Sequence, residues 1–414
     1  MRTIDTVVVG AGQAGLTMSW HLQQADRDHV VLDGRASLGG GWQDRWDAFR
    51  LVSPNWTASF PGHPYDGPDP DGFMPRDEIA GRVAGYAAVI GAPVELATEV
   101  RRLRLVGDRF RLETSGGPLE ARTVVVATGG FHVPHRPPVA EQVPEAVVQL
   151  HSQQYRSASA LPEGAVLVVG SGQSGVQIAE ELQAAGRRVF LSVGSAGRLP
   201  RRYRGSDTFR WLAEVAERGD ALGTPLPTAD RLPDPRMRLA GNPHCSGHGG
   251  GHDTNLRQLA ADGMTLLGRI DGVDGARLGL ASDLAANLAW ADRFFDERFR
   301  GLFDAFIERA EIDAPPDDRE PFDFEPPVLA ELDLERAGIT TIVWTTGYRL
   351  DYGWIELPIF DELGFPRQVD GVSEAPGLFF LGSLWLRTQA SSTLFGVGID
   401  AGRLAAAMGL PGAA

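Results

Sequence analysis

The sequence contains a single cysteine, Cys245, in 414 residues. One thiol cannot form a disulfide within the chain, and it cannot form the pair of cysteines that a dithiol redox centre requires. The cysteine count therefore excludes a disulfide-stabilised scaffold. It also excludes an enzyme that exchanges electrons through two of its own thiols.

Long apolar runs and a basic surplus are also missing. No uncharged stretch reaches the roughly 18–20 residues of a membrane-spanning helix, and the first residues do not form a basic-then-apolar leader. Basic side chains number 39 against 54 acidic ones, which gives a formal net charge of −15. Such a charge argues against nucleic acid as a partner. We therefore expect a soluble cytoplasmic protein that binds neither membrane nor nucleic acid.

Three glycines near the start form a dinucleotide-binding pattern. The apolar run Thr6–Val9 leads into Gly10, Gly12 and Gly15, and a helix-like segment follows. In this pattern the first glycine makes the turn, the second lets a pyrophosphate approach the backbone, and the third lets helix and strand pack closely. Asp33 ends the next predicted strand, eighteen residues after Gly15. A carboxylate at that distance is typical of a ribose-binding residue.

The same pattern returns about 160 residues later, at Gly170, Gly172 and Gly175. Laying the second unit on the first places Ser192 at the position of Asp33, so the acid is missing. Four arginines follow: Arg198, Arg201, Arg202 and Arg204. A small hydroxyl residue followed by arginines suits the 2′-phosphate of NADP. The alternative is a solvated basic turn.

A long segment rich in glycine, proline and tryptophan separates Asp33 from a predicted helix at 76–91. It is too long for a passive connector. Its side chains offer flat surfaces and polar groups suited to a ring system: Trp42, Trp46, Trp56, Arg45, Arg50 and Asn55. For each tryptophan, packing within the loop is the alternative.

Three histidines and the cysteine gather in a glycine-rich stretch, and they suggest a zinc site: His244, Cys245, His248 and His252. The stretch lacks a second ligand pair at a zinc-like spacing. We therefore predict no metal site and interpret the stretch as a mobile loop.

Further motifs carry a family resemblance over nearly the whole chain. VVVATGG (124–130) and IVWTTGY (342–348) resemble the two strands that link the domains of flavin-containing monooxygenases, and GLFFLGSLW resembles their last FAD-domain strand. LVSPNW, DPDGFMPRDEI, QLHSQQYR and VVGSGQSGVQIAEEL are similar to bacterial flavoproteins of the CzcO-like type.

The resemblance implies FAD at the first glycine unit and NADPH at the second. The residues expected to hold FAD are Gly10, Gly12, Gly15, Asp33, Gly40, Trp42, Gly129 and Gly382. The residues expected to hold NADPH are Gly170, Gly172, Gly175, Ser192, Arg198, Arg201 and Arg202.

Two candidate catalytic residues, Asn55 and His151, also come from the resemblance. Asn55 lies near the place where these monooxygenases put a polar group beside the flavin. The class B signature F-x-G-x-x-x-H-x-x-x-[WY] falls on His151 and Tyr155, although Glu145 and Val147 stand where its Phe and Gly belong.

The predicted fold is α/β, with two Rossmann-like dinucleotide-binding domains. The FAD-binding domain is expected at 1–160 and 334–414, and the NADP-binding domain is inserted at 161–333. Within the inserted domain, about 207–327 is expected to be a further helical and loop insertion, with helices at 208–218 and 283–311.

The resemblance implies an NADPH-dependent flavin monooxygenase. It would transfer one oxygen atom from O2, through a C4a-hydroperoxyflavin, to a small amine, sulfide, indole-like compound or ketone. Two alternatives stay open: a flavin oxidase or reductase that passes electrons to oxygen, quinone or a partner, and a non-catalytic nucleotide-bound redox sensor. A disulfide reductase is disfavoured because the cysteine pair is absent. A homodimer is left open.

Overall fold

The first of two parallel sheets is built around β1 (Arg2–Val9). The structure, a computed structural model, describes residues 1–411. β1 pairs in parallel with β2 (His29–Leu32) and with β6 (Gly117–Val126). Val7 and Val8 have no exposed surface, as expected for a parallel strand covered on both faces.

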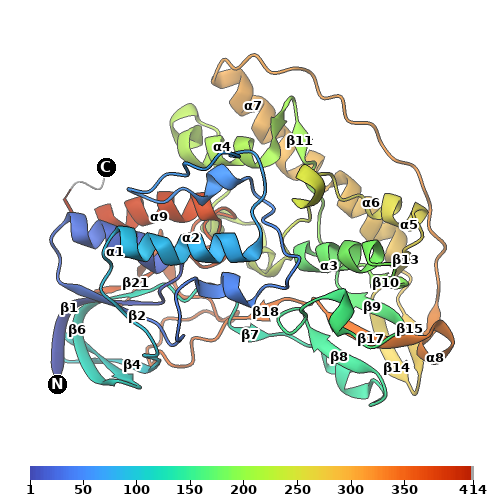
Figure 1. Ribbon diagram of the computed structural model, residues 1–414. Helices are drawn as coiled ribbons and strands as arrows, with labels where there is room; N and C mark the ends of the chain where they lie inside the picture. The colour runs from blue at the N-terminus through green and yellow to red at the C-terminus, as the bar shows by residue number, and fades with distance from the viewer. Residues whose placement is uncertain (412–414) are drawn as a thin grey trace.

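Helices cover one face of this sheet. Figure 1 shows α1 (Gln13–Gln24), α2 (Arg76–Val89) and α9 (Leu394–Ala407) above it. The sheet is completed on its edges by β3 (Val94–Glu95), β4 (Val100–Val106), β5 (Arg109–Thr114), β19 (Gln368–Val369), β20 (Val372–Ser373) and β21 (Leu378–Phe380). Its last strand and helix therefore come from the C-terminal part of the chain.

The second sheet repeats this arrangement with five parallel strands in the order β13-β10-β9-β17-β8. The strands are β8 (Val148–His151), β9 (Ala165–Val169), β10 (Val189–Ser192), β13 (Thr265–Leu267) and β17 (Ile339–Trp344). α3 (Gln173–Ala184) follows β9 as α1 follows β1. A short antiparallel sheet also belongs to this unit, formed by β14 (Ile270–Asp274), β15 (Arg277–Leu280) and β16 (Glu331–Asp333). The predicted α/β fold with two dinucleotide-binding units is confirmed.

The domain boundaries need correction. The prediction ended the first domain at 160 and resumed it at 334, but β8 and β17 pair within the second sheet. The second unit therefore extends from β8 to β17. β13 also lies in this sheet, so the segment 207–327 is not wholly an insertion. These strands were assigned to the wrong unit because a short apolar strand carries no local mark of the sheet that it joins.

The two predicted helical stretches are confirmed and share a core of their own. α4 (Thr208–Leu222) starts where the Asp207 carboxylate accepts a hydrogen bond from the Phe209 amide, and it ends at Gly223 in the left-handed conformation. α6 (Leu284–Phe295) and α7 (Gly301–Arg309) are joined by a π-helical turn. Aromatic side chains fill the space between them: Trp211, Phe295, Phe299, Phe303 and Phe306.

Short elements connect these layers. β7 (Val133–Pro134) and β18 (Tyr348–Arg349) pair where the chain passes between the two sheets, and Figure 1 shows them at that junction. The remaining elements are β11 (Arg202–Tyr203), β12 (Ser206–Asp207), α5 (Leu256–Ala261) and α8 (Leu334–Ala337). None of the helices within residues 1–411 has the length and apolar character needed to cross a bilayer.

Candidate functional site

The first glycine turn has the geometry of a dinucleotide site. Gly10 has a φ of +108°, and a Cβ on Gly15 would lie 1.8 Å from the Gly10 carbonyl oxygen, so both positions require glycine. A Cβ on Gly12 would meet nothing within 4 Å. The protein's own packing therefore does not demand glycine at position 12. The space beside the N-terminus of α1 is open at this residue, and pyrophosphate binding there stays a prediction.

Asp33 faces this turn from the end of β2. Its carboxylate accepts hydrogen bonds from the backbone amides of Ala11 and Arg35, at 2.7 and 2.8 Å. Each carboxylate oxygen can accept a second bond, so the side chain retains the capacity to bind ribose hydroxyls. Its role as the ribose ligand stays a prediction.

The segment after β2 crosses the start of α1. A Cβ on Gly40 would lie 3.1 Å from the Gly12 Cα, and the Trp42 indole N–H donates to the Gln13 side-chain oxygen at 3.1 Å. The Gln13 amide in turn donates to the Ser392 carbonyl at 3.2 Å, just before α9. The structure thus brings Gly40 and Trp42 to the first turn, and their contact with FAD stays a prediction.

Two further glycines predicted at this site, Gly129 and Gly382, differ in the space around their Cα atoms. Gly129 has a φ of +74° and open space around its would-be Cβ. A Cβ on Gly382 would lie 2.4 Å from the Cβ of Ala14, so this glycine allows the end of β21 to pack against α1.

The second turn repeats the first closely. Gly170 has a φ of +110°, and a Cβ on Gly175 would lie 1.9 Å from the Gly170 carbonyl oxygen. The nearest atom to a Cβ on Gly172 would be the Asn242 carbonyl oxygen, at 3.8 Å. The Gln173 amide donates to the Cys245 carbonyl at 2.6 Å, and its oxygen accepts from the Cys245 amide at 3.0 Å.

Gln13 and Gln173 are functional candidates that the sequence interpretation missed. Each occupies the same place in G-x-G-Q-x-G and fixes a neighbouring loop to the start of its helix. The repeated glutamine was visible in both motifs and could have identified them.

The placement of Ser192 at the position of Asp33 is wrong. The Gly10 amide donates to the Leu32 carbonyl and the Gly170 amide donates to the Ser192 carbonyl, so Ser192 corresponds to Leu32. Its hydroxyl is buried and donates to the Gly268 carbonyl at 3.0 Å. The residue at the position of Asp33 is Val193. The acid is still missing, but the hydroxyl is not available to a cofactor.

Arg201 is also not a phosphate ligand. Its side chain is 5% exposed and pairs with Asp207 at 2.8 Å. The same guanidinium donates to the Val52 carbonyl at 2.7 Å and lies between the rings of Phe73 and Phe209. Its position is therefore structural, and it connects the second unit to the long loop of the first.

Arg198 and Arg202 remain candidates for a phosphate. Arg198 contacts Asp292 at 3.3 Å, but Asp292 is held more closely, at 2.8 Å, by Arg257. Arg202 is exposed, and within residues 1–411 its side chain has no ion-pair partner.

Both candidate catalytic side chains are engaged in holding backbone. Asn55 is buried, donates to the Asp69 carbonyl at 2.9 Å and accepts from the Met74 amide at 2.6 Å. His151 is buried, its Nε2 contacts the Gly347 carbonyl at 3.0 Å and its Nδ1 accepts from the Gln153 amide. Burial lowers the pKa of His151, which favours the neutral ring. These contacts give positioning roles rather than catalytic ones.

The predicted loop at 244–252 packs beside the second turn. His244 is fully buried, and burial lowers its pKa to about 3. His252 contacts Glu180 at 2.9 Å, and the hydrogen bond to Glu180 raises its pKa. In residues 1–411 no group of three metal-ligating side chains comes together.

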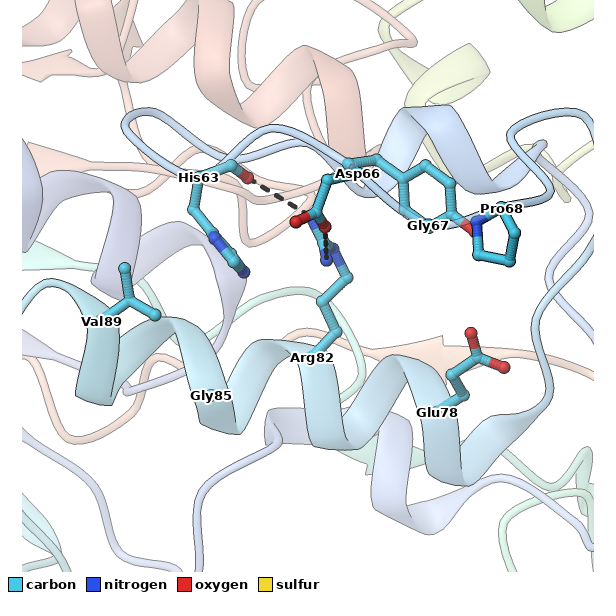
Figure 2. A pocket seen from close by; sticks show the side chains of 9 residues that line it. His63, Asp66, Gly67, Pro68, Glu78, Arg82, Gly85 and Val89 are labelled. Atoms are coloured by element: carbon cyan, nitrogen blue, oxygen red, sulfur yellow. Dashed lines mark hydrogen bonds and ion pairs between the residues drawn. The ribbon is translucent and has the colours of Figure 1, made fainter.

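A cavity of about 490 Å³ lies away from both turns, between α2 and the segment 63–68 (Figure 2). Arg82 crosses it and donates to the Pro64 carbonyl at 2.7 Å. None of the residues predicted to bind a cofactor lines this cavity.

Asp400, on α9, makes the stability of the fold depend on pH. Its side chain is buried, its Oδ2 has no hydrogen-bond partner within residues 1–411, and burial raises its pKa to about 6. The Ser391 hydroxyl oxygen accepts from the Arg387 and Thr388 amides, both at 3.0 Å.

We expect Asp400→Asn to stabilise the protein at pH 8 and to have little effect near pH 4. The folded pKa lies above the unfolded value of about 3.9, so ionisation destabilises the fold progressively as pH rises through about 6. The gain at pH 8 is at most about 3 kcal/mol. Melting temperatures of both proteins from pH 4 to 8 measure it. A variant that melts lower than the unaltered protein at pH 8 would contradict this account.

Comparisons with known proteins agree with this geometry. A family model described as pyridine nucleotide-disulphide oxidoreductase matches residues 7–213. An uncharacterized CzcO-like oxidoreductase of Geobacillus kaustophilus is 30% identical over 402 residues, which cover 96% of each chain. This chain belongs to that oxidoreductase family. The predicted CzcO-like resemblance is confirmed, and the family supports FAD and NADPH as the cofactors.

Two more distant relatives are monooxygenases. The indole-3-pyruvate monooxygenase YUCCA1 of Oryza sativa is 32% identical over 221 residues, which cover 50% of this chain and 53% of that one. The solved flavin-containing monooxygenase from Stenotrophomonas maltophilia has the same fold, with a TM-score of 0.66 and 22% identity over 99% of both chains.

Proposed function

We propose that the protein is an NADPH-dependent flavin monooxygenase that transfers one oxygen atom from O2 to a small organic molecule. One observation carries the proposal: the chain holds two equivalent glycine turns, each with open space over its middle glycine. The Asp33 carboxylate faces the first turn, whereas Val193 stands at the equivalent position of the second. Two dinucleotides of different kind fit this pair of turns. With a single cysteine, the chain cannot use the dithiol route.

When bound, FAD and NADPH would supply hydride transfer and oxygen activation. The chain's own residues bind and orient. The N-termini of α1 and α3 would hold the two pyrophosphates, and Gln13 and Gln173 fix the loops beside them. His151 holds Gly347 where the chain passes between the two units.

The choice of NADPH over NADH rests on Val193, Arg198 and Arg202. An apolar residue at the position of Asp33 does not repel a 2′-phosphate, and either arginine can contact one. Arg201 is excluded from this role by its burial.

The test is incorporation of labelled oxygen. FAD-loaded protein is supplied with NADPH, ¹⁸O₂ and a panel of small amines, sulfides, indoles, ketones and organic acids. We expect NADPH consumption to rise with a substrate and one ¹⁸O atom to appear in the product by mass spectrometry. NADPH oxidation that yields only hydrogen peroxide with every compound would overturn the proposal.

That outcome would favour an NADPH oxidase. Glu145 and Val147 depart from the class B signature, and this departure supports the oxidase as the second candidate.

A further inference from the structure

Arg45 lies at the junction of the two units. It follows the short helix Gly40–Asp44, whose Trp42 is bonded to Gln13 at the first glycine turn. Its guanidinium carbon lies 4.6 Å from the ring centre of Phe131, and the Phe131 ring lies 5.1 Å from that of Tyr348. Phe131 directly follows the ATGG segment after β6, and Tyr348 begins β18 after β17. Arg45 therefore lies beside both segments that connect the two sheets, the one after β6 and the one after β17.

The guanidinium is held by aromatic rings instead of by an acid. Phe49 contributes a second ring at 5.8 Å from its central carbon. Within residues 1–411 no carboxylate lies within 4 Å of the Arg45 side chain, and its guanidinium makes no hydrogen bond. The adjacent Asp44 is not available, because both of its oxygens pair with Arg35. In a chain with an acidic surplus, this enclosed cation has been left without a counterion.

The Nε of this cation is buried without a hydrogen-bond partner. Arg45 is partly exposed, and Phe131 retains 50% of its surface. The rings that contact the guanidinium accept no ordinary hydrogen bond from it, so its N–H groups have no partner within residues 1–411. A planar fork of donors matches a carboxylate, and the exposed ring of Phe131 provides an apolar surface for the body of a ligand.

We propose that Arg45 binds the carboxylate of the substrate, so that the substrates are small organic acids with an apolar or aromatic body. This proposal rests on the proposed function, because the bound carboxylate is a substrate only if the protein is a monooxygenase. A phosphate group of NADPH is also an anion that the Arg45 guanidinium could bind. The experiment therefore distinguishes a substrate carboxylate from a cofactor phosphate.

The test measures binding without turnover. FAD-loaded full-length protein is titrated by calorimetry with phenylacetate, with the neutral phenylacetamide and with NADP⁺. We expect phenylacetate to bind about tenfold or more tightly than phenylacetamide. Arg45→Met should remove this difference and change the NADP⁺ dissociation constant less than about twofold.

The matched control is Arg188→Met. The guanidinium carbon of Arg188 also lies over one phenylalanine ring, 5.0 Å from the centre of Phe190, but Arg188 directly precedes β10 in the second sheet. Arg188→Met should leave the affinities for phenylacetate, phenylacetamide and NADP⁺ unchanged. Equal binding of phenylacetate and phenylacetamide to the unaltered protein would overturn the assignment. A tenfold loss of NADP⁺ affinity in Arg45→Met, with carboxylate binding intact, would instead assign the arginine to the cofactor. Both results are independent of whether labelled oxygen enters a product.

Discussion

Replacing Gly12 with valine is expected to give a folded protein that purifies without flavin. Gly12 has extended backbone angles, φ −79° and ψ −173°, which any residue can adopt, and a Cβ there meets nothing within 4 Å. The valine methyl groups would occupy the space that a pyrophosphate needs beside α1. We expect flavin content, measured from the visible absorbance against protein absorbance, to fall at least about tenfold.

The second turn supplies the matched control. Gly172→Val places the same side chain on the equivalent residue, where the nearest atom is 3.8 Å away. This variant should keep its flavin and lose NADP⁺ binding. Loss of flavin from both variants would point to misfolding, and full flavin content in Gly12→Val would refute the assignment of the first turn.

Arg201→Met should destabilise the protein strongly, and much more than Arg202→Met. The substitution leaves Asp207 without its cation, in a place where burial already raises the pKa of this carboxyl. It also leaves the Val52 carbonyl without its donor and removes the cation between Phe73 and Phe209. Removing one partner of a buried ion pair costs about 3–5 kcal/mol.

Arg202, the exposed neighbour of Arg201, provides the control variant for this loss of stability. Arg202→Met should change the melting temperature little, because surface charges contribute about 0–1 kcal/mol. Thermal unfolding of the two variants, with bound FAD monitored separately, gives the result. If Arg201→Met has the same melting temperature as the unaltered protein and weakens NADP⁺ binding, Arg201 is a cofactor ligand.

The glycine turns were predictable because their requirements are local. A positive φ at Gly10 and the close approach of Gly15 to the Gly10 carbonyl are satisfied by glycine alone, and the residues that impose them lie within one strand–turn–helix unit. The same holds for the helices of the inserted region, whose apolar residues recur at helical spacing. These features follow from neighbours along the chain.

The side-chain roles were not predictable in the same way. Whether Arg201 meets a phosphate or a carbonyl depends on Val52 and Asp207, and the first of these lies far away in the sequence. Asn55 and His151 were assigned by resemblance, but their hydrogen bonds are made to loop carbonyls and amides. Ser192 was misplaced by a single residue, and in a strand one residue reverses the face to which a side chain points.

The position of β21 and α9 also determines when the first site can exist during synthesis. β21 pairs with β6, and α9 packs beside α1, so the sheet that carries Gly12 and Asp33 is completed by the last part of the chain. The second sheet, from β8 to β17, is made from one continuous segment and is available earlier. On the ribosome the second unit can therefore form first. The first unit is completed only when β21 and α9 have been added, so its glycine turn gains its last neighbours after the second unit.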